Sequence, residues 1–441
     1  MLNLVYNEKV EKLGITLFEE QLVRVYLNSD NGDLFKKLSN SFSIKIFTSI
    51  DLQKKIEKIL IDLNLNFCEV QSLPTLNESR LARFFGFFLR WNLPDTGTRL
   101  AMSFSKKKGI LNRVIFIARY LSWRTSFIFK FLIPLFRYLY GIAVFRSLGS
   151  LQSGIKKDKL DILFATSITN LCQDIPLCVL TKKNGGKIIG TVRSWDNLSI
   201  HGLLRWIPDK VLSQSPYMTQ NLLVNQRVKG AIVEELGTPA YREEFIPNKL
   251  EKKLKRRVIY ACSGIRNNPD EKNFLNLLIE FFAQNEYPVE MYLLQHPNSP
   301  HLYLDEITAG TNIQTITFEY LKTSLHEYYK FLSSADLVLC AGTTVALDAL
   351  FCEVEVKTIG FELEKVDYWH SSLRSFDTRP HTRDLFTRYE IPMINNFHQL
   401  LNEILGKNIV TDSLTREHYE HFLGQKNQEF VDRFIREFKH C

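Results

Sequence analysis

Short apolar runs alternate with segments of helical periodicity along most of the chain. Near the start, Leu22–Leu27 and Ser43–Thr48 are apolar runs of strand length. Residues 51–64 repeat apolar positions at helical spacing behind Asp51, a candidate cap, and residues 66–70 return as a strand. This order predicts a parallel sheet covered by helices.

The same pattern resumes at Leu160, after a segment of different composition. Apolar runs predict further strands, and the segments between two pairs of them predict helices. The predicted strands are residues 160–165, 187–192, 209–214 and 231–236, and the predicted helices are residues 170–182 and 216–225.

A second α/β pattern follows the charged stretch 247–257. Its order of strands and helices is typical of a doubly wound sheet. The predicted strands are residues 258–262, 289–294, 313–317, 337–340 and 354–359, and the helices are residues 270–285, 324–333 and 345–351. Residues 417–439 predict one charged, amphipathic helix at the end.

We therefore expect an α/β protein with two Rossmann-like, doubly wound domains that face each other across a cleft. The length of 441 residues agrees with two or three domains. The expected division is an N-terminal domain over 1–246, a linker over 247–257, a C-terminal domain over 258–410 and a C-terminal helix over 411–441.

A basic, aromatic segment over about 78–157 interrupts the first domain and predicts a helical insertion. From Arg80 to Lys157 it holds fifteen Lys or Arg residues and a single acid, Asp95. Its longest apolar stretch is broken by charges and a proline, so a membrane span is not expected. Cationic, aromatic helices fit an anionic membrane surface. The alternative is an insertion whose arginine stems pack over the domain. The segment has no signature of a nucleic-acid-binding module.

The composition is that of a folded globular protein, with 45% hydrophobic and 24% charged residues. Seven cysteines form no CxxC pair, and several lie in apolar runs. They indicate reduced, buried thiols, and we expect neither a disulfide framework nor a metal site. With no secretory signal at the start, the expected location is the cytoplasm.

The stretch 333–360 carries the strongest chemical signal. A strand, a small-residue turn and a helix follow one another, and the turn holds Gly342, Thr343 and Thr344. Backbone N–H groups and two hydroxyls at a helix start suit a phosphate. Asp348 lies one helical turn further, within reach of a ribose or sugar hydroxyl. The alternative is that Thr343 or Thr344 only caps the helix.

Three further loops follow predicted strands. The loop 193–202 contains Asp196 and His201, the proton-transfer candidates of the first domain. A structural turn for Asp196 and a structural hydrogen bond for His201 are the alternatives. In the second domain, Ser263, Gly264 and Arg266 follow one strand and His296 and Pro297 follow the next, and these loops suit a nucleotide phosphate. The sequence has no Walker A or GxGxxG motif.

These residues resemble a known group of enzymes. The His296-Pro297 pair and the Ser/Thr-rich turn are similar to GT-B-fold bacterial glycosyltransferases of surface-polysaccharide assembly. This resemblance covers roughly residues 160–405, and the C-terminal half resembles in particular the capsule-type Kdo and sialic acid transferases. Thr343-Thr344-Val345-Ala346-Leu347-Asp348 also resembles a motif of CDP-glycerol glycerophosphotransferases.

The resemblance implies that His296, Thr343 and Thr344 bind the donor phosphate and that Asp348 binds the ribose or neighbouring groups. It implies no cofactor and no metal. Glu234-Glu235-Leu236-Gly237 does not match the acidic base motif of the sialyltransferases, so Asp196 is assigned as base from its loop position.

We thus expect transfer of a sugar from a nucleotide-sugar to a glycan or glycolipid acceptor. The expected place is the inner face of the cytoplasmic membrane, where the basic segment contacts the anionic surface, and no nucleic acid is expected as a partner. The alternatives are a polyol-phosphate transferase that uses a CDP-alcohol, a nucleotide-sugar epimerase and a non-catalytic scaffold peripheral to the membrane.

Overall fold

The structure is a computed structural model of the chain. It describes most of the two α/β regions and leaves gaps in the basic segment and in several loops. The described residues are 10–28, 32–74, 78–91, 113–114, 117, 121, 131–148, 159–169, 174–246, 255–263, 268, 270–284, 287–296, 304, 308–309, 311, 313–316, 324–341, 344–363, 383–388, 391–407, 416–424 and 429–439.

Contacts divide the chain into two compact units. Unit 1 holds the described residues of 10–91, 125–240 and 429–439, and unit 2 holds those of 113–121 and 241–424. The division falls at Ala240 and Tyr241, a few residues before the stretch 247–257 that the sequence indicates as a linker.

Unit 1 is built on a seven-stranded sheet in the order β3-β2-β1-β4-β5-β6-β7, and every pair in it is parallel. This order places β1 in the interior, where the winding direction of the chain reverses between β1 and β4. The strands are β1 (Glu11–Leu17), β2 (Phe42–Ser49), β3 (Glu69–Leu73), β4 (Ile162–Ala165), β5 (Lys187–Thr191), β6 (Lys210–Ser213) and β7 (Val233–Glu235).

The start of unit 1 differs from the sequence prediction. Leu22–Leu27 was predicted as a strand, but Glu20–Tyr26 is the helix α1, and the first strand is Glu11–Leu17. The buried residues of α1 are Leu22, Val23 and Tyr26, a spacing that lies on one side of a helix. An apolar run this short fits either a helix or a strand. Because Glu11–Leu17 already fills the place between β2 and β4 in the sheet, the run that follows it forms a helix.

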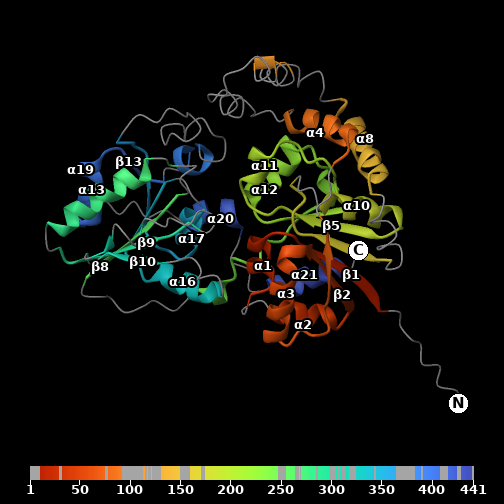
Figure 1. Ribbon diagram of the computed structural model, residues 1–441, viewed down its shortest axis with the longest axis horizontal. Helices are drawn as coiled ribbons and strands as arrows, with labels where there is room; N and C mark the ends of the chain where they lie inside the picture. The colour runs from red at the N-terminus through yellow and green to blue at the C-terminus, as the bar shows by residue number, and fades with distance from the viewer. Residues whose placement is uncertain are drawn as a thin grey trace. The chain divides into compact units, whose positions relative to one another are not determined.

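Helices cover the sheet of unit 1, and Figure 1 shows them around it in red, orange and yellow-green, with the last one, from the end of the chain, in blue. They are α1, α2 (Gly32–Ser39), α3 (Ile50–Asp62), α4 (Arg80–Trp91), α8 (Ile133–Arg146), α10 (Asp174–Lys183), α11 (Asn197–Ile200), α12 (Pro216–Gln220) and α21 (Phe430–Lys439). A π-helical turn covers Asn221–Asn225, and a short 3-10 turn covers Gly230–Ile232. A second 3-10 turn, Glu243–Phe245, belongs to unit 2. No helix in the described parts of the chain is long and apolar enough to cross a bilayer.

The end of the chain forms two helices, where the sequence predicted one over 417–439. α20 (Arg416–Leu423) belongs to unit 2, and α21 belongs to unit 1. Phe434 and Phe438 of α21 pack their rings 5.1 and 5.4 Å from Phe164 of β4. The apolar side of α21 therefore completes the core of the first sheet. The residues in contact are more than 260 positions apart in the sequence.

Unit 2 is built on a six-stranded parallel sheet in the order β10-β9-β8-β11-β12-β13. Its strands are β8 (Arg256–Ala261), β9 (Val289–Leu294), β10 (Gln314–Ile316), β11 (Leu337–Cys340), β12 (Val356–Ile359) and β13 (Met393–Ile394). Its helices include α13 (Glu271–Ala283), α16 (Leu325–Ser333), α17 (Val345–Phe351), α19 (Phe397–Ile404) and α20, with a π-helical turn over Arg383–Arg388. Both sheets thus confirm the predicted pair of Rossmann-like α/β folds.

Candidate functional site

Unit 1 gathers polar residues at the carboxyl ends of its three central strands. Glu19 follows β1, Ser167 and Thr169 follow β4, and Arg193 follows β5. Since β1, β4 and β5 are adjacent and parallel, the loops that follow them leave the same edge of the sheet. This edge, at the point of chain reversal, is where open α/β sheets bind ligands.

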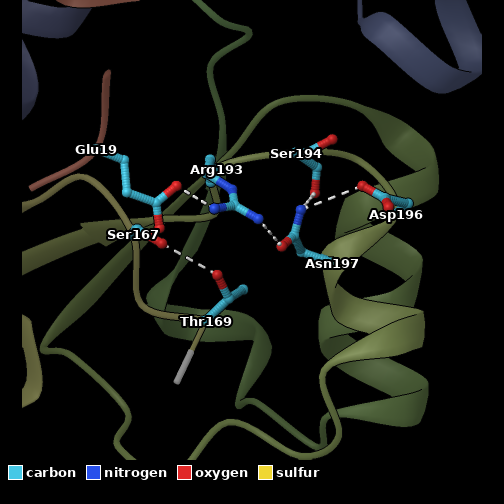
Figure 2. Close-up of polar contacts among 7 residues, drawn as sticks. All are labelled: Glu19, Ser167, Thr169, Arg193, Ser194, Asp196 and Asn197. Atoms are coloured by element: carbon cyan, nitrogen blue, oxygen red, sulfur yellow. Dashed lines mark hydrogen bonds and ion pairs between the residues drawn. The ribbon is translucent and has the colours of Figure 1, made fainter. Parts of the chain in front are cut away.

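A chain of polar contacts crosses this edge (Figure 2). Nη1 of Arg193 is ion-paired with the carboxylate of Glu19, and Nη2 of Arg193 donates to Oδ1 of Asn197 over 3.3 Å. Nδ2 of Asn197 donates to Oδ1 of Asp196 over 3.1 Å and to the carbonyl oxygen of Ser194 over 3.3 Å. Asp196 is thus oriented by an amide that is itself held by a paired guanidinium.

Asp196 and His201 lie at the two ends of α11. Asp196 is the residue before the helix, and His201 is the residue after it. The rise of an α-helix separates the two residues by about 7.5 Å along the axis. Asp196 is half-buried and belongs to the polar chain of Figure 2, and His201 is half-buried at the far end of the short helix. Their roles in proton transfer stay predictions.

A buried acid lies below this edge, and the sequence analysis did not single it out. Asp174, in the first turn of α10, is only 1% exposed and accepts a hydrogen bond from the hydroxyl of Thr16. The backbone N–H of Thr166 donates to the same hydroxyl over 3.0 Å. Burial, with a smaller effect of the Glu19 charge, raises the pKa of Asp174 to about 7. An acid in the first turn of a helix that follows a strand was the available signal.

Unit 2 brings together three of the residues predicted to bind the donor. Ser263 follows β8, His296 follows β9 and Thr344 follows β11, and the sheet order places these three strands side by side. Ser263 is buried, His296 is half-buried and Thr344 is exposed at the start of α17. The hydroxyl of Thr344 makes no capping hydrogen bond, so it does not act as the simple helix cap that was the alternative.

Five other predicted donor residues lie outside the described residues. They are Gly264, Arg266, Pro297, Gly342 and Thr343. Within the described part of the chain, no group of three His, Cys, Asp or Glu side chains is arranged to hold a metal ion.

The buried Glu271 organises the Ser263 loop. Oε1 of Glu271 accepts hydrogen bonds from the backbone N–H of Ser263 at 2.7 Å, from the Ser263 hydroxyl at 3.0 Å and from the Tyr260 hydroxyl at 2.9 Å. Burial raises the pKa of Glu271 to about 7, although these donors act in the opposite direction. The Ser263 hydroxyl therefore has a structural partner in addition to its predicted role.

Asp348 has two tyrosine partners within unit 2. Its Oδ1 accepts a hydrogen bond from the Tyr241 hydroxyl and its Oδ2 accepts one from the Tyr328 hydroxyl, each over 2.7 Å. Burial and the nearby Asp348 charge raise the pKa of Tyr241 well above its ordinary value. These bonds attach α17 to α16 and to the first residue of unit 2, and contact of Asp348 with a ribose stays a prediction.

No protein-family profile and no curated protein matches the sequence. Solved structures do match over nearly the whole length. A UDP co-structure of Staphylococcus aureus MnaA has a TM-score of 0.52 at 11% identity and covers 98% of this chain and 96% of that one. The UDP-GlcNAc 2-epimerase of Methanocaldococcus jannaschii has a TM-score of 0.50 at 12% identity, with 98% and 100% covered. The calicheamicin glycosyltransferase CalG4 has a TM-score of 0.51 at 10% identity, with 98% of each chain covered.

These likenesses cover nearly the whole chain and hence both of its parallel sheets. The chain has the GT-B fold. In a GT-B protein each of the two α/β domains presents the carboxyl edge of a parallel sheet as its binding edge. The Arg193–Asp196 cluster of unit 1 and the Ser263, His296 and Thr344 loops of unit 2 both lie at such edges.

Proposed function

We propose that this protein is a glycosyltransferase that uses a nucleotide-sugar donor. One observation carries the proposal: the loops of Ser263, His296 and Thr344 lie at one edge of the second sheet of a GT-B fold. Hydroxyls and an imidazole at such an edge suit a nucleotide phosphate. The MnaA structure, a complex with UDP, and CalG4, a glycosyltransferase, add support through their shared fold.

In the proposed reaction, an acceptor hydroxyl attacks the anomeric carbon of the sugar. The new bond joins that oxygen to the anomeric carbon, and the bond from the anomeric carbon to the donor phosphate breaks. Asp196 takes the proton of the acceptor hydroxyl, and the bonding electrons leave with the phosphate. His296 and the hydroxyl of Thr344 stabilise the negative charge that forms there. This assignment places donor binding in unit 2 and acceptor activation in unit 1.

The acceptor in this proposal is a glycan or glycolipid at the cytoplasmic face of the membrane. The basic character of the segment around α4 and α8 supports this location, because cationic and aromatic helices bind anionic lipid surfaces. No cofactor is proposed, because the nucleotide-sugar itself carries the leaving group.

A thermal-shift screen of the purified protein with CMP, CDP, UDP, GDP and dTDP tests donor binding. A nucleotide that binds only the folded state adds about 2.7 kcal/mol of stability at 100 times its dissociation constant. We expect a rise in Tm with one of the five. We expect Thr344→Ala and His296→Ala to abolish this rise and Thr311→Ala, a control in the same unit, to keep it. No rise with any nucleotide would contradict the proposal.

A nucleotide-sugar 2-epimerase is the second candidate, and the likeness to the M. jannaschii epimerase favours it. An epimerase converts the nucleotide-sugar with no acceptor present. Incubation of the protein with the nucleotide-sugar selected by the screen, followed by NMR of the anomeric and C2 protons, separates the candidates. A new epimer in the absence of acceptor would replace the transferase proposal. An unchanged donor that is consumed only after acceptor is added would support it.

A further inference from the structure

Helix α4 presents arginines and phenylalanines on its outward face. Its buried side is formed by Ala82, Gly86 and Leu89. The opposite side carries Arg80, Leu81, Arg83 and Phe84, all exposed, and the Phe84 ring packs 5.1 Å from that of Phe88. Phe84 remains 54% exposed in this cluster. Large apolar rings between exposed arginines are unusual on a face that meets only water.

Helix α8 extends this face. It is apolar on nearly every side: Tyr140, Ala143 and Val144 are buried against the unit, yet Leu135 is 48% and Tyr138 is 66% exposed. The ring of Phe136 contacts Phe85 at 6.0 Å and Phe88 at 5.5 Å, which joins the two helices. Figure 1 shows α4 and α8 next to each other on the outside of unit 1. We call the exposed residues Arg80, Leu81, Arg83, Phe84, Leu135 and Tyr138 the α4–α8 face.

The charge of the α4–α8 face has one sign. Neither helix contains an acidic residue. The nearest acid in the sequence, Glu78, points inward, where it pairs with Arg205 at 2.6 Å and accepts a hydrogen bond from Tyr140. The arginines of this face therefore have no carboxylate on their own helices, and their complement is an anionic surface.

We propose that the α4–α8 face docks the protein on an anionic lipid bilayer. The guanidinium groups of Arg80 and Arg83 donate to lipid phosphates, and Leu81, Phe84, Leu135 and Tyr138 enter the boundary between head groups and acyl chains. A bilayer satisfies the apolar and the cationic parts of this face together, whereas an acidic polymer satisfies only the charge. In this docking the helices lie on the membrane surface.

The same two helices hold the loop that follows α11. The backbone N–H of Leu203 donates to the carbonyl of Leu89 in α4 over 3.1 Å. Nε of Arg137 in α8 donates to the carbonyl of Leu204 over 2.8 Å. Docking would therefore place this loop, and Asp196 before it, close to the lipid surface. This step rests on the proposed function and gives the acceptor class as lipid-linked.

Flotation of the full-length protein with vesicles tests the docking. One set of vesicles is pure phosphatidylcholine, and the other contains about a third phosphatidylglycerol. We expect flotation only with the anionic vesicles, and loss of flotation at high salt, since salt screens the attraction between basic residues and such a surface. Arg80→Glu with Arg83→Glu should lower the bound fraction at least tenfold. Phe84→Ser with Tyr138→Ser should lower it on anionic vesicles as well.

Helix α3 offers matched controls on the same unit. Lys54→Glu with Lys58→Glu makes the same change of net charge at exposed positions, and Ile61→Ser removes an apolar side chain that is 64% exposed. We expect both controls to float like the parent protein. Equal losses in the controls, or no flotation of the parent, would overturn the docking. The alternative outcome in sedimentation is a dimer that dissociates only in the variant with Phe84→Ser and Tyr138→Ser, without any vesicle binding. In that case the partner of the α4–α8 face would be a second copy of the protein and not a bilayer.

Hydrogen exchange separates the docking from its link to the acceptor loop. On anionic vesicles we expect slower exchange of the amides of Leu203 and Leu204, with no change at Asn184 on the opposite edge of the sheet. Unchanged exchange at Leu203 and Leu204 would overturn the link. The nucleotide thermal shift should survive in all α4–α8 variants, so failure of docking and failure of donor binding give different results.

Discussion

The side-chain amide of Asn197 donates a hydrogen bond to Oδ1 of Asp196 over 3.1 Å. The oxygen of the same amide accepts from Arg193 over 3.3 Å, and Arg193 is paired with Glu19. One amide thus joins the predicted base to an ion pair that links its own loop, after β5, to Glu19, after β1. This contact orients a carboxylate that would otherwise rotate freely at the start of a four-residue helix.

Asn197→Asp replaces this donor with a second carboxylate. A like charge beside Asp196 favours its protonated form and removes its orienting bond. We expect kcat to fall by about ten- to a hundredfold, less than the roughly 10²–10⁴-fold that general base catalysis contributes, because Asp196 itself is kept. The KM for the donor should stay unchanged, and the acidic limb of the pH–rate profile should move to higher pH. Steady-state kinetics between pH 5 and 9 measure these changes.

Asn184→Asp is the control for this variant, since Asn184 precedes β5 and lies at the opposite edge of the sheet. It should leave the pH profile unchanged. An Asn197→Asp enzyme with the parental pH profile would show that Asp196 is not the base.

Gly202 and Gly185 share a backbone φ of +83°, but only Gly202 is crowded. A Cβ at Gly202 would lie 2.4 Å from the carbonyl oxygen of Arg90 in α4, whereas nothing lies within 4 Å of a Cβ at Gly185. Each change to Ala costs about 1–2 kcal/mol for the left-handed backbone. We expect Gly202→Ala to cost about 1–3 kcal/mol more, because α4 must move.

Denaturant unfolding of both alanine variants measures this difference in the free energy of unfolding. The shared φ makes Gly185→Ala a direct reference for the backbone term. Equal losses in the two variants would mean that α4 does not pack tightly against the loop 201–206.

Asp174 makes the stability of unit 1 depend on pH. Its pKa is about 7 in the folded protein, against about 3.9 in an unfolded chain. Between these values the folded state holds more protons, so the free energy of unfolding falls as pH rises. The stabilisation is complete below pH 4 and is lost as pH passes 7.

Asp174→Asn keeps a neutral side chain and should remove this part of the slope. We expect the fall in Tm from pH 5 to pH 8 to shrink by roughly 3–8 °C, as a change of a few kcal/mol gives in a domain of this size. Glu271, whose pKa is also raised to about 7, should leave a remaining slope. Asp62→Asn, at an exposed position of α3, is the control. An unchanged slope in Asp174→Asn would show that Asp174 is ionised in the folded state.

The Tyr241–Asp348–Tyr328 contact predicts which role of Asp348 dominates. Tyr328→Phe removes the 2.7 Å bond to Oδ2 and should cost about 1.5–3 kcal/mol, the range for a hydrogen bond to a charged group. Tyr241→Phe should act similarly, and the double variant should be non-additive because both bonds share one carboxylate. Thermal unfolding measures all three variants.

Tyr287→Phe is the matched control, since the Tyr287 ring stacks on Phe281 and its change keeps that contact. A nucleotide shift that persists in Tyr328→Phe but disappears in Asp348→Asn would support contact of Asp348 with the ribose. A shift that persists in both variants would leave Asp348 with a structural role alone.

The sequence determined most of the strands of both sheets. Runs such as Leu337–Cys340 and residues 291–294 are apolar throughout because parallel strands between helices are buried on both faces. The turns that hold Ser263, His296 and Thr344 could also be predicted from the sequence. Each of them follows the end of an apolar run, and that end lies at the carboxyl edge of the sheet. The two-domain α/β fold followed from the order of these elements.

The tertiary structure alone decided which distant residues meet. β1 was missed because its identity as a strand depends on its neighbours β2 and β4, and Glu19 therefore had no visible partner in Arg193, 174 residues later. Asp174 became notable only through burial against Thr16, and α21 only through its packing on Phe164. Local periodicity reports which face of an element is apolar, whereas the pairing of strands across a sheet fixes which side chains share an environment and hence their charge, orientation and pKa.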